Sequence, residues 1–125
     1  MPDTMKFQPL TEGFGTEILG ADLARLGDED FARIWQTWLE RHLVVIRAQN
    51  LTAQQFHAFA KRLGQPQPHV INQFHHPEIA DILILSNVLK DGQPTGLQDA
   101  GTYFHTDYSY LAQPEIGRAS CRERV

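Results

Sequence analysis

A histidine and an aspartate two residues apart, His105 and Asp107, are the side chains whose types and spacing best suit metal chemistry. They lie within residues 102–110, a run of aromatic and β-branched residues that predicts a strand. Residues two apart on a strand point to the same face, so we expect the imidazole and the carboxylate to converge. Together they can supply two ligands of a 2-His-1-carboxylate facial triad, which holds Fe(II) and leaves positions open for a cosubstrate and O2.

The spacing alone is weakly specific, because so short a motif arises by chance in a chain with six histidines. A surface histidine beside a carboxylate on a strand is the alternative interpretation. Tyr103 shares the predicted face, and Asn87 follows a predicted buried strand, so both are candidates for the entrance of a pocket. For Tyr103 the alternative is packing against the wall of a barrel.

Two short apolar stretches near the start of the chain, residues 7–10 and 15–19, are punctuated by glycines and predict two strands that pair through a turn. Acidic residues beginning at Asp28 precede an apolar stripe at helical spacing, and we expect this helix to end near Arg41 and His42. The stripe, with both tryptophans expected in the core, consists of Phe31, Ile34, Trp35, Trp38 and Leu39.

The next elements can also be predicted from local signals. The β-branched residues 43–46 predict a strand buried on both faces. A second helix is predicted over residues 53–63, because Thr52 and Gln55 form a capping box before it and Gly64 can end it.

The remaining segments read as loops around one more strand. Residues 65–77 carry three prolines and three histidines without periodicity and predict a surface loop. Residues 82–85 predict another buried strand, residues 90–92 a turn and residues 93–101 a second loop. The order of elements is that of an α+β or all-β domain with its helices on the N-terminal side. We assign no role to His42, His57 or the pair His75 and His76 beyond structure or solvation.

Composition limits the class of partner. The 125 residues fit one ordinary domain, and the formal charge of −4 gives no broad basic field for nucleic acid or an anionic membrane surface. No apolar run approaches the roughly 20 residues that cross a bilayer. The start of the chain lacks a secretory signal and there is one cysteine, Cys121, so we expect a cytoplasmic protein with a small-molecule partner, no nucleic acid and no membrane.

Several ordered blocks of the sequence resemble one family. The block around the candidate metal ligands, residues 99–110, reads DAGTYFHTDYSY and is followed by Pro114. Residues 13–23 read GFGTEILGADL, and further similar blocks are HLVVIR, LTAQQF and FAKRLG. From about Leu10 to Pro114 the chain resembles the TauD/TfdA family of Fe(II)- and 2-oxoglutarate-dependent dioxygenases.

The resemblance implies an α+β, mainly β fold: a double-stranded β-helix (jelly-roll, cupin-like) with N-terminal helices, incomplete in this chain. It implies His105 and Asp107 as the first two iron ligands and His69 as a substrate contact in the loop after the second helix. The implied reaction consumes O2, decarboxylates 2-oxoglutarate to succinate and CO2, and hydroxylates a small organic substrate. A homo-oligomer is left open for the full-length protein.

The family's third iron ligand, a downstream histidine, and the arginine that follows it to bind 2-oxoglutarate have no counterpart here, since no histidine follows Asp107. The last residues, 116–125, read IGRASCRERV and look like the translation of a sequencing-library adapter. We therefore expect residues 1–115 to be the N-terminal part of a dioxygenase domain, inactive alone, and residues 116–125, with Arg118, Arg122 and Arg124, to be a non-native tail.

Two other hypotheses remain open. The chain could be a non-catalytic, cupin-like metal-binding or sensory module that holds one ion with His105, Asp107 and a loop histidine such as His69. It could also be a plain structural domain in which the two potential ligands lie near each other incidentally.

Overall fold

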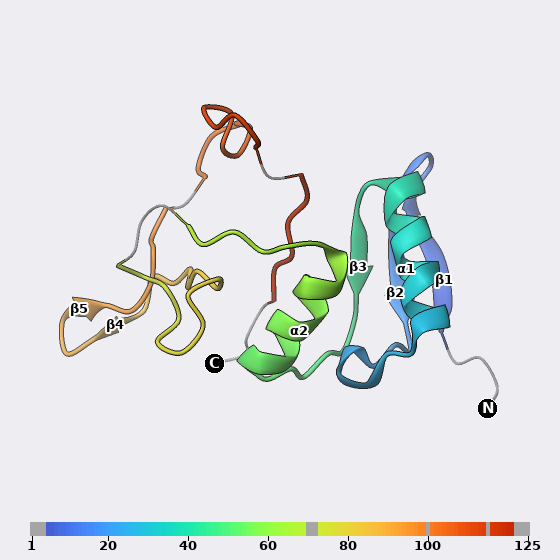
Figure 1. Cartoon of the computed structure of the whole chain (residues 1–125), viewed down its shortest axis with the longest axis horizontal. Helices are drawn as coiled ribbons and strands as arrows, with labels where there is room; N and C mark the ends of the chain where they lie inside the picture. The colour runs from blue at the N-terminus through green and yellow to red at the C-terminus, as the bar shows by residue number, and fades with distance from the viewer. Residues whose placement is uncertain (1–4, 70–72, 100, 115, 122–125) are drawn as a thin grey trace. The chain divides into compact units, whose positions relative to one another are not determined.

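The computed structural model describes residues 5–69, 73–99, 101–114 and 116–121. The chain divides into two compact units, Met1–Phe59 and Ala60–Val125, and helix α2 (Ala53–Leu63) runs across the boundary between them (Figure 1). Within the described residues, no helix is long and apolar enough to cross a membrane.

A three-stranded sheet forms the base of the first unit, in the order β1-β2-β3. Strands β1 (Lys6–Thr11) and β2 (Phe14–Leu19) pair antiparallel, which confirms the predicted pairing. Their turn contains Gly13 at φ +78°, a conformation that glycine adopts without steric cost. Strand β3 (Val44–Ile46) then pairs parallel to β2, after a crossover through the first long helix.

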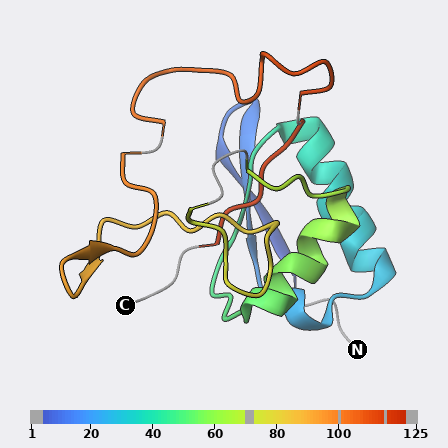
Figure 2. The ribbon, with the colours of Figure 1, turned by 60° about the vertical axis from the view of Figure 1, so that its left-hand side comes forward.

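Helix α1 (Asp28–Arg41) is that crossover and has the predicted bounds. It lies along one face of the sheet, as two views of this unit show (Figures 1 and 2). It ends at His42, which adopts φ +70° and donates its backbone N–H to the carbonyl of Trp38 at 2.8 Å. Ile34 points from α1 into a small core with Met5 and Ile18, the last of which is fully buried.

Two burial predictions for this unit are wrong. Trp35 and Trp38 are half-buried and Leu39 is 53% exposed, because only part of the apolar stripe of α1 meets the sheet. Strand β3 is half-buried along its length rather than buried on both faces. It lies at the edge of the sheet, and among the described residues β2 is the one strand that pairs with it.

The capping box of α2 is confirmed. The side chain of Gln55 accepts the backbone N–H of Thr52 at 2.9 Å, and Thr52 Oγ1 accepts the backbone N–H of Gln55 at 3.1 Å. Each bond satisfies a donor that has no partner within the helix. Phe59 is buried and meets Phe31 of α1 edge to face at 6.2 Å, so these two helices share an aromatic contact inside the first unit.

In the second unit, residues 82–85 are extended and paired on both sides, but they form isolated bridges rather than a buried strand. Ile84 N donates to Phe74 O at 2.9 Å, and Leu97 N donates to Ile84 O at 2.8 Å. Leu85 is 48% exposed and the other three residues are half-buried, so the segment makes backbone pairs but is not the buried strand that the sequence predicts.

A short hairpin follows, made of β4 (Leu89–Lys90) and β5 (Gln93–Pro94). Asp91 and Gly92 form its turn at φ +52° and +76°, so the turn predicted at residues 90–92 is confirmed. The predicted loop 93–101 accordingly begins with two paired residues, and its end, residue 100, lies outside the described residues.

The strand predicted over residues 102–110 is wrong. The structure has bends and turns there, with Tyr108 at φ +52° and Leu111 N donating to Tyr108 O at 3.0 Å. Aromatic and β-branched residues favour a pleated surface, but a strand also needs a neighbour for its backbone groups, and no described segment pairs with this one. Phe104 is consequently fully exposed.

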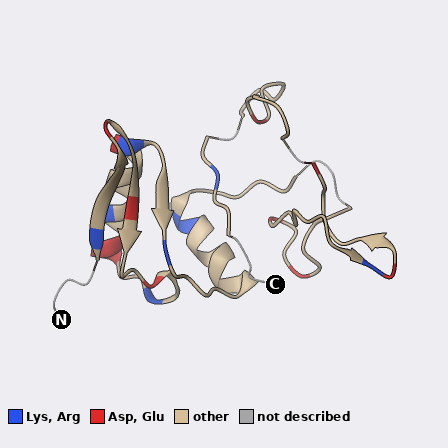
Figure 3. Cartoon of the chain, turned by 180° about the vertical axis from the view of Figure 1, so that it is seen from behind, with Lys and Arg blue, Asp and Glu red and all other residues tan. Residues whose placement is uncertain are grey.

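The α+β character is present, but the sheets of the described residues have three and two strands and do not form a double-stranded β-helix. The two long helices also exceed any strand in length, in contrast to the mainly β expectation. Acidic and basic residues both occur along the elements of the first unit, with tan stretches between them (Figure 3). Of the tail residues singled out above, Arg118 is described, whereas Arg122 and Arg124 lie outside the described residues.

Candidate metal centre

His105 and Asp107 lie together although their segment is not a strand. Nε2 of His105 is 3.0 Å from Oδ1 of Asp107. The bend that begins before His105 and the turn that includes Asp107 bring the two side chains together locally. The predicted convergence is therefore present, and the turn replaces strand alternation as its cause.

Both ring nitrogens of His105 face oxygen atoms that can only accept a hydrogen bond. Nδ1 lies 2.7 Å from the carbonyl oxygen of Tyr103, and Nε2 lies 3.0 Å from Oδ1 of Asp107. A neutral imidazole carries hydrogen on one nitrogen and therefore donates to one of these oxygens. When Nδ1 donates to Tyr103, Nε2 presents a lone pair beside the carboxylate, and a cation could bind both atoms.

The donor set fits a first-row divalent ion. Such ions bind imidazole nitrogen and carboxylate oxygen at about 2.0–2.2 Å, so two ligands at a right angle lie about 3 Å apart. The observed separation of Nε2 and Oδ1 is 3.0 Å. The side chains of His105 and Asp107 are 32% and 48% exposed, which leaves the site accessible to further ligands. Within the described part of the chain, no third histidine, cysteine or acidic residue joins them in a group suited to a metal.

The other predicted site residues differ in how close they come to this pair. The ring of Tyr103 lies 5.5 Å from the ring of His105 and is largely exposed to solvent. His69 packs its ring 5.8 Å from that of Tyr108, the residue after Asp107, so it belongs to the same neighbourhood. Asn87 is exposed before β4, and none of its described contacts links it to His105 or Asp107.

His75 and His76 make local backbone contacts. Nε2 of His75 donates to the carbonyl of His69 at 2.8 Å, because that oxygen can only accept. Nδ1 of His76 accepts the backbone N–H of Glu78 at 3.2 Å. Both rings thus help to shape the loop, in line with the absence of an assigned role.

Three residues near the pair could not be found by motif. Gly101 lies at φ +64°, and a Cβ built on it would be 2.7 Å from Cε1 of the His105 ring. Tyr108 has a buried hydroxyl for which the described residues offer no partner. Nη1 of Arg118 is 3.6 Å from Oδ2 of Asp107, the carboxylate oxygen that does not face His105. The positive φ of Tyr108 and the contact of Arg118 have no local sequence signal.

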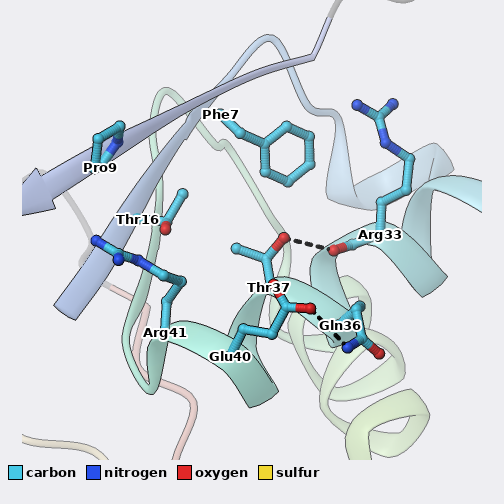
Figure 4. A pocket seen from close by; sticks show the side chains of 8 residues that line it. All are labelled: Phe7, Pro9, Thr16, Arg33, Gln36, Thr37, Glu40 and Arg41. Atoms are coloured by element: carbon cyan, nitrogen blue, oxygen red, sulfur yellow. Dashed lines mark hydrogen bonds between the residues drawn. The ribbon is translucent and has the colours of Figure 1, made fainter. Parts of the chain in front are cut away.

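A separate open groove of about 460 Å³ lies between α1 and the β1–β2 hairpin in the first unit (Figure 4). The polar groups along it are largely paired within the protein. Nη2 of Arg41 donates to the carbonyls of Thr11 and Gly15 at 2.7 and 3.0 Å, and Thr37 Oγ1 donates to the carbonyl of Arg33. Arg33 lies over the ring of Phe7 at 4.8 Å. We therefore interpret the groove as part of the packing boundary between α1 and the sheet rather than as a ligand site.

Comparison with protein families gives one match over most of the chain. Residues 6–117 match the family described as taurine catabolism dioxygenase TauD, TfdA family. The match includes both His105 and Asp107 and ends one residue before Arg118.

Curated relatives and solved structures agree with this match. The chain is 33% identical over 116 residues to pentalenolactone F synthase from Streptomyces arenae, covering 89% of the chain and 38% of that protein. It is 33% identical over 92 residues to the (S)-phenoxypropionate/alpha-ketoglutarate-dioxygenase of Delftia acidovorans, covering 74% of the chain and 29% of that protein.

One crystal structure, assigned as an alpha-ketoglutarate-dependent taurine dioxygenase from Burkholderia xenovorans, resembles the chain with a TM-score of 0.65 at 27% identity. The similarity covers 88% of the chain and 38% of that protein. The chain thus spans well under half the length of the relatives it matches.

Proposed function

The chain belongs to the TauD/TfdA dioxygenase family, and from this premise we propose that it supplies two metal ligands, His105 and Asp107, to an Fe(II)- and 2-oxoglutarate-dependent dioxygenase. The observation that carries the proposal is the 3.0 Å separation of Nε2 of His105 and Oδ1 of Asp107. Nε2 has a lone pair available for the metal when Nδ1 donates to the Tyr103 carbonyl.

Each residue has a distinct task in this proposal. His105 binds the metal through the lone pair of Nε2, and the Tyr103 carbonyl holds the opposite nitrogen as the donor. The carboxylate of Asp107 binds beside it and offsets part of the positive charge. When bound, Fe(II) supplies the redox chemistry that couples O2 to decarboxylation of 2-oxoglutarate and hydroxylation of a substrate. The exposure of the site leaves space for these molecules.

We propose that the remaining parts of the site come from sequence outside these 125 residues. No histidine follows Asp107, and the chain spans 38% of the length of pentalenolactone F synthase. The third metal ligand and the arginine that binds 2-oxoglutarate would then lie in a longer protein that completes the jelly-roll. On this basis the 125-residue chain alone does not turn over, and residues 116–125 are not part of the native domain.

The substrate class proposed for that longer protein is a small organic acid. The (S)-phenoxypropionate/alpha-ketoglutarate-dioxygenase of Delftia acidovorans, a relative at 33% identity, is named for such a compound. His69 and Tyr103 remain proposed substrate contacts, because each lies next to a residue of the 105–108 segment. Asn87 is proposed from sequence alone.

The test is binding of a metal to the purified chain. Mn(II) is a suitable probe, because it accepts imidazole and carboxylate ligands and its paramagnetism broadens nearby NMR resonances. We expect Mn(II) to broaden the backbone amide signals of residues 105–107 in the 125-residue chain, and we expect His105→Ala and Asp107→Ala to reduce this broadening. His57→Ala, on α2, is the matched control that leaves binding unchanged. Equal broadening in all four proteins would contradict the assignment.

A second measurement distinguishes between two hypotheses: that the chain is part of an enzyme, and that it is a non-catalytic metal-binding module. The longer protein is expected to release succinate from 2-oxoglutarate, whereas the 125-residue chain is expected to release none. Metal binding by the longer protein, lost in His105→Ala but without 2-oxoglutarate consumption, would favour the non-catalytic module instead.

A further inference from the structure

The backbone of Gly101 lies against the imidazole of His105. A Cβ built on Gly101 would be 2.7 Å from Cε1 of that ring, 3.4 Å from Nε2 and 3.7 Å from Nδ1. Real Cβ atoms essentially never approach another atom to less than 3.0 Å. The ring can therefore occupy its observed position only when residue 101 has no side chain.

This contact completes a set of restraints on the ring. Tyr103 O holds Nδ1 at 2.7 Å, Asp107 Oδ1 lies 3.0 Å from Nε2, and the Gly101 backbone lies against Cε1, the atom between the two nitrogens. The side chain of His105 is 32% exposed, so solvent leaves one side of it without packing. Loss of any one restraint allows the ring to turn about its χ angles.

We propose that Gly101 is a positioning residue for His105: the missing side chain lets the imidazole edge rest on the backbone, so that Nε2 faces Asp107. The inference concerns the orientation of the ring, and its consequence for metal binding rests on the function proposed above. Residues that orient a metal-binding histidine commonly change metal affinity by 10–100-fold when they are replaced.

The chain provides a matched control for the backbone effect. Gly101 and Gly92 both adopt positive φ, +64° and +76°, and both belong to the second unit. A Cβ on Gly92 would meet nothing within 4 Å. Gly101→Ala and Gly92→Ala therefore carry a similar backbone strain, and only the first displaces the ring of His105.

Two readouts follow from this difference. Because Cε1 is near the free end of a side chain, we expect the ring to turn away in Gly101→Ala, with an unfolding midpoint that falls no further than in Gly92→Ala. The ¹⁵N NMR signals of the His105 ring should be alike in the unsubstituted chain and in Gly92→Ala, and shifted in Gly101→Ala, where the ring loses its two contacts. The Mn(II) concentration that half-broadens these signals should rise about tenfold or more in Gly101→Ala alone.

The outcomes distinguish the two proposals. Without Mn(II) binding to the unsubstituted chain, the metal site is contradicted, and the ring signals recorded without metal still decide the role of Gly101. If the His105 ring signals of Gly101→Ala match those of the unsubstituted chain, the positioning role is wrong. Should Gly101→Ala fail to fold, the double variant Gly101→Ala with His105→Ala decides: recovery of folding supports contact through the ring, and continued failure overturns it.

Discussion

Asp107 lies 3.6 Å from Arg118 through Oδ2, the carboxylate oxygen turned away from His105. The guanidinium of Arg118 and the proposed metal would therefore both interact with the carboxylate of Asp107 and compete for its negative charge. Arg118 is one residue beyond the family match and belongs to the segment, residues 116–125, for which the sequence predicts a non-native tail. Both side chains are about half exposed, so the pair is worth about 0.2–1 kcal/mol.

Removal of Arg118 should therefore strengthen metal binding slightly. In Arg118→Ala we expect the Mn(II) affinity of the chain to rise by up to about fivefold, the equivalent of about 1 kcal/mol. NMR titration with Mn(II) measures the affinity, and Lys90→Ala, an exposed cation on β4 in the same unit, is the control. A lower affinity in Arg118→Ala would show that the guanidinium supports the carboxylate rather than competing for it.

The capping box of α2 provides a prediction about stability. In Thr52→Ala the backbone N–H of Gln55 loses its acceptor, and we expect the free energy of unfolding to fall by about 0.5–2 kcal/mol. The control is Thr37→Ala in α1, where Oγ1 donates back to the carbonyl of Arg33. That bond supports no helix terminus, so this change should be neutral or slightly stabilising. Urea unfolding followed by circular dichroism measures both, and equal losses would contradict a capping role.

These examples show which parts of the fold local signals can specify. The bounds of α1 and α2 and the pairing of β1 with β2 were all predictable, because a helical stripe, a capping box or a short glycine turn acts between residues close in sequence. Burial was predicted less well. Trp38 and Leu39 satisfy the stripe, but how much of it is covered depends on segments far away in the chain.

In the candidate site, too, contacts between residues close in sequence were easier to predict than contacts that depend on the rest of the fold. The proximity of His105 and Asp107 was predicted, yet the strand from which it was predicted is a turn, since a strand depends on a partner that propensity does not supply. Arg118 reaches Asp107 by a contact across the intervening turn, for which there is no motif. The role of Gly101 depends on its φ and on the position of a ring four residues later, and neither can be read from residue types.

Gly96 is a second glycine with a steric requirement, here against the backbone. A Cβ on Gly96 would lie 2.8 Å from Ser86 N and 2.9 Å from Ile84 O, two atoms that hydrogen-bond Leu97. We expect Gly96→Ala to weaken these bonds at a cost of about 1–3 kcal/mol. Faster hydrogen exchange at the backbone amides of Ser86 and Leu97 in Gly96→Ala would show that these hydrogen bonds are weaker.

The matched control for Gly96 is Gly64→Ala. Gly64 follows α2, and a Cβ there would meet nothing within 4 Å. Exchange at Ser86 and Leu97 should be unchanged in this variant. Unchanged exchange in Gly96→Ala as well would mean that residues 84–86 can move aside, contrary to the close packing described.

The buried hydroxyl of Tyr108 should cost stability in the absence of a ligand. Its Oη is shielded from solvent and has no hydrogen-bond partner among the described residues, whereas the neighbouring Tyr110 is 71% exposed. A buried polar group without a partner costs about 1–3 kcal/mol, so Tyr108→Phe should raise the free energy of unfolding by up to that amount. The hydroxyl of Tyr110 is exposed to water, so Tyr110→Phe should change the free energy of unfolding by less than about 0.5 kcal/mol. Urea unfolding of both variants measures the difference, and a loss of stability in Tyr108→Phe would reveal a partner for the hydroxyl and contradict its unpaired state.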